Sequence, residues 1–173
     1  MRIRDSKGFT LIELLIVVAI IGIIAAIAVP GLLRARISGN EASAIGSIRA
    51  IISAQADYNG LNRGYATDLA DLAALCVGMT VPFISPDLSF NGVAKSGYTF
   101  NLAAGLGGVT GPNDCMGTAT STTFYADATP QSVGTTGNRA FASNVGSAIW
   151  QDTVGTPPTE PFVAGGTISP LGQ

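Results

Sequence analysis

The sequence predicts an α+β fold in which a long N-terminal α-helix packs on a small antiparallel β-meander. An uncharged apolar run covers residues 14–33, and apolar residues at helical spacing follow over residues 34–62. Short alternating segments bounded by turn residues then occupy residues 97–152. The length of 173 residues allows one ordinary domain with an appendage.

Composition removes several classes of function. The chain has no histidine, which excludes Ser-His-Asp and Cys-His catalysis as well as histidine-ligated zinc. Its two cysteines are too few for an all-thiolate zinc site, and no phosphate-binding P-loop motif occurs. A net charge of -2 gives no basic surface for nucleic acid. We therefore expect no catalytic residues, no metal and no cofactor.

The apolar run at residues 14–33 is the strongest single feature. As a helix it would span about 30 Å, the hydrocarbon thickness of a bilayer, with no polar face. The helix of a soluble core would need more covering protein than this chain has, and a cleaved secretory signal would have a shorter run. A plain membrane anchor leaves Glu13 unexplained, because a carboxylate deep in lipid costs about 2.5–3.5 kcal/mol.

The segment KGFTLIE at residues 7–13, followed by the long apolar helix, resembles the class III signal of type IV pilins and type II secretion pseudopilins. Gly22 and Pro30 also stand where this family usually has a glycine and a proline. The resemblance implies the pilin fold, cleavage by prepilin peptidase after Gly8, and N-methylation of Phe9.

The resemblance divides the chain into four parts that agree with the composition. These are a leader peptide at 1–8, a hydrophobic transmembrane and filament-core helix at 9–33, an amphipathic continuation at 34–62, and a globular head at 63–173 with about four antiparallel strands near 97–152.

The chemistry of the motif can be argued from its residues. Gly8 has no side chain, so its backbone can approach a protease closely. Cleavage there removes the three basic residues of the leader and leaves a cationic amine on Phe9. In a bundle of such helices, the amine of one subunit could meet Glu13 of a neighbour and set the axial register. The resemblance assigns Glu13, with Thr10, to filament assembly.

Gly22, Pro30 and Gly31 all lower helical stability and predict a break in the long helix. Two outcomes remain open at this stage. In some assembled relatives the stretch between the matching glycine and proline is unwound, whereas the alternative is a bend in an intact helix.

The resemblance further implies a structural subunit of a homo-oligomeric helical filament, not an enzyme, with adhesion, motility or DNA uptake as its uses. Its partners would be prepilin peptidase, an inner-membrane assembly platform with its ATPase, and membrane lipid before assembly, with no small-molecule substrate. Arg2, Arg4 and Lys7 favour a single pass through the inner membrane with a cytoplasmic N-terminus, which Arg34 and Arg36 partly oppose. After assembly the subunit would lie in a cell-surface pilus.

Two other functions compete with the pilus subunit. One is a type II secretion pseudopilin that forms a periplasmic piston, because pilins and pseudopilins share the signal and the plan of the head. The other is a membrane-tethered enzyme or solute binder, which would need a convergent polar site, and the sequence shows none.

The rest of the chain reads as short elements separated by turns. Thr67 and Asp68 predict the start of a short helix that ends near residues 76–78. Residues 79–97 lack a long period and predict a loop, and the proline- and glycine-rich residues 155–173 predict an irregular tail. The expected strands are at 97–102, 123–128, 138–142 and 147–151.

Cys76 and Cys115 are the only thiols. A head exported across the inner membrane enters an oxidising space, where a lone pair of cysteines is expected to form a disulfide. A loop of about 40 residues closed in this way would add about 4 kcal/mol of stability. The alternative is a pair of buried free thiols.

Three weaker motifs favour plain structural roles. The glycine-rich residues 105–111 lack the spacing of a phosphate loop, so a flexible connector is expected there. Asp114, Asp127 and Asp152 could bind calcium, but no calcium-loop motif surrounds them, which favours solvated surface acids. Residues 118–123 could carry O-linked sugar, although a plain polar loop is the simpler expectation.

Overall fold

The computed structural model describes residues 8–172 of the chain. The chain divides into two compact units, Met1–Arg36 and Ile37–Gln173. The predicted α+β class is confirmed, because one long N-terminal helix is followed by an antiparallel sheet in the head. The leader residues 1–7 lie outside the described residues.

Helix α1 spans Leu11–Asn62, a length of 52 residues, and includes Pro30. Its end is set by Arg63, which has a left-handed backbone (φ 60°) and donates its N–H to the carbonyl of Asn59 at 2.9 Å. This is a common way for a helix to satisfy its last carbonyls.

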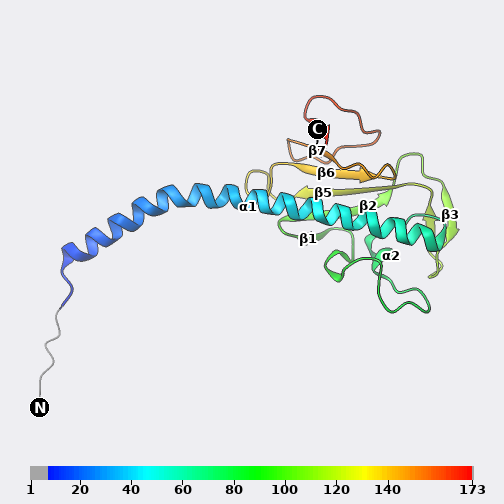
Figure 1. Ribbon diagram of the computed structural model, residues 1–173, viewed down its shortest axis with the longest axis horizontal. Helices are drawn as coiled ribbons and strands as arrows, with labels where there is room; N and C mark the ends of the chain where they lie inside the picture. The colour runs from blue at the N-terminus through cyan, green and yellow to red at the C-terminus, as the bar shows by residue number, and fades with distance from the viewer. Residues whose placement is uncertain (1–7, 173) are drawn as a thin grey trace, which may run out of the picture. The chain divides into compact units, whose positions relative to one another are not determined.

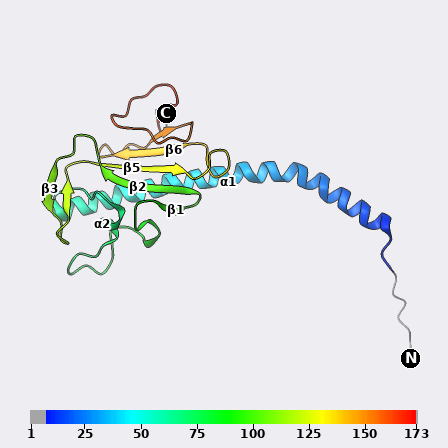
Figure 2. The same cartoon turned by 180° about the vertical axis from the view of Figure 1, so that it is seen from behind.

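The second half of α1 packs on the sheet of the head. In Figure 1 this half passes in front of the strands, and in Figure 2, seen from behind, the strands lie in front of it. The buried side chains recur every three or four residues, at Ala44, Ile48, Ile51, Ala54, Gln55 and Tyr58. Ile45 and Ile52, which also recur at helical spacing, are only partly buried and pack against this core.

The main sheet has six antiparallel strands in the order β1-β2-β5-β6-β7-β8. The four expected strands are present as β2 (Tyr98–Ala104), β5 (Phe124–Pro130), β6 (Ala140–Asn144) and β7 (Trp150–Asp152). Alternate side chains of these strands face α1 and join one core, in which Phe100 pairs with Ala128 and Ala128 with Phe141. The opposite side of the sheet is called the outer face below.

Two strands at the edges of the sheet were not predicted. They are β1 (Val93–Lys95), inside the expected loop, and β8 (Ile168–Pro170), inside the expected irregular tail. Both predictions were wrong at these positions. Three residues are too few to show a period of two, and each strand is recognised only through its pairing with the adjacent strand of the sheet, β2 for β1 and β7 for β8.

Smaller elements complete the head. Helix α2 (Leu69–Ala73) forms as predicted, and the Asp68 side chain caps it by accepting the N–H of Ala70 at 2.8 Å. It ends before residues 76–78. A 3-10 helix, η1 (Pro86–Leu88), also interrupts the expected loop.

Strands β3 (Thr110–Asn113) and β4 (Ala119–Ser121) form a separate two-stranded sheet. They replace part of the connector expected at 105–111 and half of the polar loop expected at 118–123.

Candidate functional site

The first half of α1 is fully exposed in the single chain. Every large apolar side chain from Leu11 to Leu33 is at least 42% exposed. Within residues 8–172 this is the one helix that is long and apolar enough to cross a membrane. Such a surface is stable only when lipid or other protein covers it, since each Å² of apolar area left in water costs about 25 cal/mol.

Thr10 and Glu13 form a reciprocal pair at the start of α1. The N–H of Thr10 donates to Oε2 of Glu13 at 2.9 Å, and the Thr10 hydroxyl donates to the same oxygen at 2.7 Å. The N–H of Glu13 in turn donates to Oγ1 of Thr10 at 3.2 Å. This is a capping box, which satisfies backbone donors that the first turn of a helix leaves free.

The capping box leaves the charge of Glu13 without a cation inside the described chain. The ion pairs among residues 8–172 are Arg139–Glu41 and Lys95–Asp87, so neither involves Glu13. Both donors from Thr10 bind Oε2. A cation from outside can therefore approach Oε1 without displacing Thr10, and the carboxylate is held in one orientation for it.

The backbone on either side of the predicted cleavage position is accessible. A Cβ added to Gly8 would meet no atom within 4 Å, and Phe9 is 86% exposed. Cleavage and methylation at this position stay predictions. The cationic part of the expected leader lies outside the described residues.

Helix α1 is continuous through the predicted break. Gly22, Pro30 and Gly31 all lie within it, and a Cβ on either glycine would meet open space. Proline has no N–H to bond the preceding turn, so this stretch holds fewer hydrogen bonds than the rest of the helix. Unwinding in an assembled filament remains a prediction.

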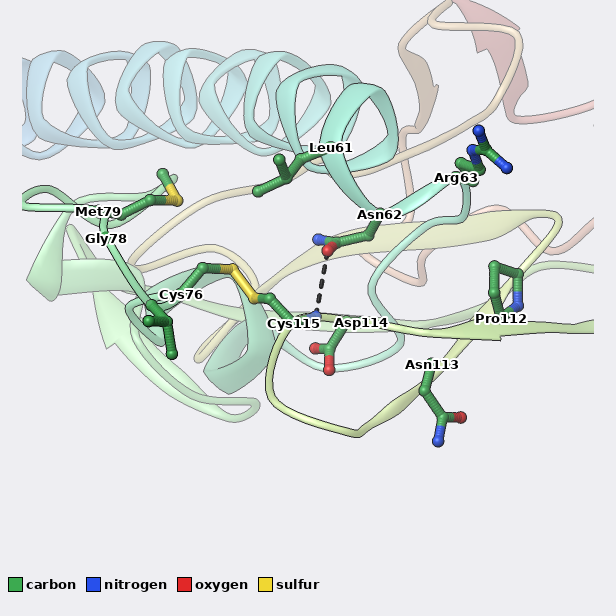
Figure 3. Close-up of a pocket in the computed structure, with 11 residues that line it drawn as sticks. Leu61, Asn62, Arg63, Cys76, Gly78, Met79, Pro112, Asn113, Asp114 and Cys115 are labelled. Atoms are coloured by element: carbon green, nitrogen blue, oxygen red, sulfur yellow. Dashed lines mark hydrogen bonds between the residues drawn. A yellow bond between two sulfur atoms is a disulfide. The ribbon is translucent and has the colours of Figure 1, made fainter.

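The disulfide between Cys76 and Cys115 is present at the far end of α1 (Figure 3). It joins the loop after α2 to the turn between β3 and β4. The side chain of Asn62 accepts the N–H of Cys115 at 3.2 Å, which ties the end of the helix to the same turn. A surface depression of about 550 Å³ lies beside the disulfide and includes Leu61 and Met79 in its lining.

Asp114 organises this turn. Its carboxylate accepts the hydroxyl of Tyr58 at 2.6 Å and the N–H groups of Met116 and Thr118 at 2.8 and 2.7 Å. Burial acts to raise the pKa of Asp114, but these hydrogen bonds outweigh it and hold the pKa below its usual value. Burial and the contact with Asp114 raise the pKa of Tyr58.

The three acids considered for calcium do not come together. Asp114 lies in the β3–β4 turn, Asp127 lies in the middle of β5, and Asp152 lies at the end of β7. Within residues 8–172 no group of three or more histidine, cysteine or acidic side chains is arranged to hold a metal ion.

A buried ion pair in the head was missed at the sequence level. Glu41 is only 6% exposed. Its carboxylate accepts hydrogen bonds from Nε and Nη2 of Arg139 at 2.9 and 2.7 Å. It also accepts the backbone N–H groups of Asn138 and Arg139. Burial acts to raise the pKa of Glu41, but these donors and the positive charge lower it overall. A signal was present, because Glu41 falls on the buried stripe of α1 between Ile37 and Ala44.

Residues 3–29 match a family profile described as a prokaryotic N-terminal methylation motif. The type IV wide pilus major component PilA4 of Thermus thermophilus is 36% identical over 107 residues, which cover 62% of this chain and 79% of that protein. The type II secretion system core protein G of Escherichia coli is 31% identical over 105 residues, which cover 60% of this chain and 69% of that protein.

A third relative matches over a shorter stretch. The type IV major pilin protein PilA of Myxococcus xanthus is 45% identical over 53 residues, which cover 31% of this chain and 24% of that protein. No significant match to a solved structure was found.

Proposed function

Because the chain belongs to the family of type IV pilins and type II secretion pseudopilins, we propose that it is a structural subunit of a type IV pilus filament. The observation that carries this proposal is the first half of α1, an exposed apolar helix with a single capped carboxylate. A helix of this kind needs a cover that its own chain does not supply. Like neighbours in a filament supply that cover along its whole length.

The processing step follows from the same region. Prepilin peptidase would cut after Gly8 and methylate Phe9, leaving residues 9–33 as the membrane segment and later the filament core. Residues 34–62 and 63–173 would form the head outside the membrane. The accessible backbone at Gly8 supports this assignment.

The role of Glu13 is to set the register between subunits. In an apolar bundle an unpaired carboxylate is penalised, whereas one that meets a cationic amine of a neighbouring Phe9 is neutralised. The two charges lose hydration when they meet, so the pair selects one axial offset more than it adds net stability. Thr10 supports this role by fixing the orientation of the carboxylate.

The remaining partners follow from the filament. Before assembly the subunit would cross the inner membrane once, with its N-terminus in the cytoplasm. An assembly platform and its ATPase would then extract it into a cell-surface pilus. Neither a catalytic role nor a small-molecule substrate is part of this proposal.

The deciding experiment combines mechanical shearing of cells with mass measurement and N-terminal sequencing of the sheared protein. We expect long filaments whose subunits begin at a methylated Phe9. A Gly8→Leu variant should keep its leader and form no filaments. Native protein that retains residues 1–8 and stays a membrane-bound monomer would overturn the proposal.

The second candidate is a pseudopilin of type II secretion. The similarity to core protein G of Escherichia coli, and to that of Klebsiella michiganensis at 34% identity over 102 residues, supports it. A pseudopilin would also be processed at Gly8, but it would remain with the cell in the periplasm after shearing. Processed protein that is absent from the sheared fraction, together with a secretion defect on deletion, would favour this candidate.

A further inference from the structure

The C-terminal segment at residues 155–163, called the strap below, is held on the outer face of the main sheet. Figure 1 shows the end of the chain, in orange to red, beside β6 and β7. Pro158 is fully buried, and its carbonyl accepts the hydroxyl of Tyr125 at 2.8 Å. Tyr125 lies on β5 and points to the outer face, since Phe124 and Ala126 on either side belong to the core.

A second anchor of the strap is Glu160. Its carboxylate accepts the N–H of Leu106 at 2.6 Å and the side-chain amide of Asn144 at 2.6 Å. The strap is thus bound at two points. Pro158 is held by Tyr125 of β5, and Glu160 is held by both the end of β6 and the loop after β2.

Phe162 completes the contact with aromatic stacking. Its ring lies 5.5 Å from Trp150 at an interplanar angle of 24° and 6.2 Å from Tyr125. Trp150 is on β7 and Tyr125 is on β5, so the ring of Phe162 spans the strand between them. Ala142 of that strand points to the outer face and is 0% exposed, which shows how closely this region is covered.

Asp127 lies in the same covered region. It is opposite Ala142, which is in turn opposite Trp150. It is 8% exposed, and its Oδ2 accepts only two neutral donors, Asn101 Nδ2 at 3.3 Å and the Thr129 hydroxyl at 3.2 Å. Both bonds are at the long end of the range for hydrogen bonds.

The groups around Asp127 provide no compensating charge. On β2 its partner is the neutral Asn101, on β5 the nearest titratable group of the same face is Tyr125, and in line with it on β7 is the uncharged Trp150. Asp152 of the same face and Glu160 of the strap are acids and supply no positive charge. β6 contributes no titratable side chain. Residues 140–173 contain no lysine or arginine, and among the described residues the two ion pairs involve other acids.

We propose that the protonation state of Asp127 controls whether the strap stays on the sheet. With its proton in place, the carboxyl group is neutral and the covered region is stable. When the proton passes to water, the resulting carboxylate lies in the covered region and has no cation among the described residues to pair with. The strap then loosens, water reaches Asp127, and the faces of Tyr125 and Trp150 become exposed.

The expected direction with pH follows from the environment of the group. Burial raises the pKa of Asp127 above its ordinary value of 3.8, and the bonds from Asn101 and Thr129 only partly oppose this. The closed strap is therefore most stable at a pH below the ordinary pKa of an aspartate. Its stability is lost as the pH rises through the raised pKa of Asp127. The proposal does not depend on whether the chain assembles into a pilus or a pseudopilus.

Trp150 makes the test direct, because it is the only tryptophan in the chain and it stacks on the strap. The protein without its leader, residues 9–173, is titrated in detergent micelles from about pH 4 to about pH 8. This range lies on either side of a raised carboxyl pKa. Tryptophan emission and its quenching by acrylamide are recorded. We expect a shift to longer wavelength and stronger quenching as the pH rises.

Three variants identify the responsible group. Asp127→Asn should keep the emission of the closed state at every pH, whereas Asp152→Asn, a matched buried acid of the same face, should retain the transition. Phe162→Ala should show the open emission even at low pH. A wild-type protein with no transition, or a transition unchanged by Asp127→Asn, would overturn the proposal.

A second measurement decides the matter if Asp127→Asn fails to fold. The carboxyl carbon shifts of the wild-type protein report the titration of each aspartate by nuclear magnetic resonance. The midpoint for Asp127 should coincide with that of the Trp150 emission. An Asp127 midpoint that differs from the emission midpoint would contradict the proposed coupling.

Discussion

Glu13 and Glu41 lie on the same helix, but among the described residues only Glu41 is paired with a cation. Glu41 lies in the head, is nearly fully buried, and meets Arg139 of its own chain at 2.7 Å. Glu13 lies in the exposed apolar half, where its partner in the chain is the uncharged Thr10. Glu41 therefore completes the fold of the head, whereas the charge of Glu13 has no cation among the described residues and is the one that we propose a neighbouring subunit pairs.

This difference separates two kinds of stability in one helix. The head half of α1 is stabilised by contacts within the chain, so its stability does not depend on protein concentration. The apolar half gains its cover from lipid or from other copies, so its behaviour depends on what surrounds it. Changes to the two regions should accordingly be detected by different measurements.

The largest effect is expected from Glu13→Leu. In the proposed filament this change removes the charge that would select the register, while the helix becomes more compatible with lipid. Sheared filaments should fall by about tenfold or more, because ~1.4 kcal/mol per subunit contact already changes an equilibrium tenfold. Quantification of sheared protein by immunoblot measures this.

A matched control comes from the head. Glu41→Gln removes the other carboxylate of the same helix and should still be processed and assembled, although the subunit is less stable. Equal filament loss from both variants would show that the comparison between the two glutamates is wrong.

Loss of the disulfide should have the next largest effect, and that effect should be confined to the head. Replacing Cys76 and Cys115 by serine reopens a loop with a sequence separation of 39 residues, which lowers the free energy of unfolding by about 4 kcal/mol. Denaturant unfolding in micelles, followed by Trp150 fluorescence, gives the value. Leader cleavage should be unaffected, and a processing defect would contradict the separation of the two regions.

Arg139→Met should lower the free energy of unfolding by about 3 kcal/mol, because it leaves Glu41 buried without its cation. This loss of unfolding free energy lies at the low end of the range for breaking a buried ion pair, because the Arg139 side chain is 35% exposed. The double variant Glu41→Gln with Arg139→Met should recover part of the loss. A double variant as unstable as the sum of the two single variants would mean that the pair does not interact.

A smaller effect concerns acid stability. The pKa of Glu41 is lower in the folded head than its ordinary value of 4.5. Its contribution to the free energy of unfolding is therefore complete at a pH above that ordinary pKa, and it is lost as the pH falls through the lowered pKa. Wild-type unfolding free energy should therefore decline in acid more steeply than that of Glu41→Gln. Parallel curves for the two proteins would remove Glu41 as the cause.

The smallest effect is expected from Thr10→Val, which removes the hydroxyl of the capping box. Loss of an N-terminal cap costs about 1 kcal/mol of helix stability. Filament yield should drop partly, and amide exchange over residues 11–14 should become faster, whereas Thr10→Ser should behave as wild type. A loss as complete as that of Glu13→Leu would give Thr10 a role beyond capping.

The first half of α1 could be predicted from the sequence because its signals are local. The apolar run and the position of Glu13 within it need no knowledge of distant residues. The capping box was not predicted, although its signal is equally local, a threonine followed three residues later by a glutamate. The disulfide was predictable because only one pairing of Cys76 and Cys115 exists.

Features of the head that join distant residues were not predictable in the same way. Glu41 and Arg139 are far apart in the sequence, and only the fold brings them together. The strap lacks any period, so its contacts through Pro158 and Phe162 could not be anticipated. Asp127 looked like a surface acid because nothing in its sequence neighbourhood indicates what covers it.

The edges of the six-stranded sheet bear on how heads behave when many are crowded together. The edge strands β1 and β8 have three residues each, and Lys95 lies in the first and Pro170 in the second. Short edges that carry a charge or a proline resist pairing with the strands of another molecule. Subunits can therefore pack closely through their apolar helices without edge-to-edge pairing between the sheets of neighbouring heads.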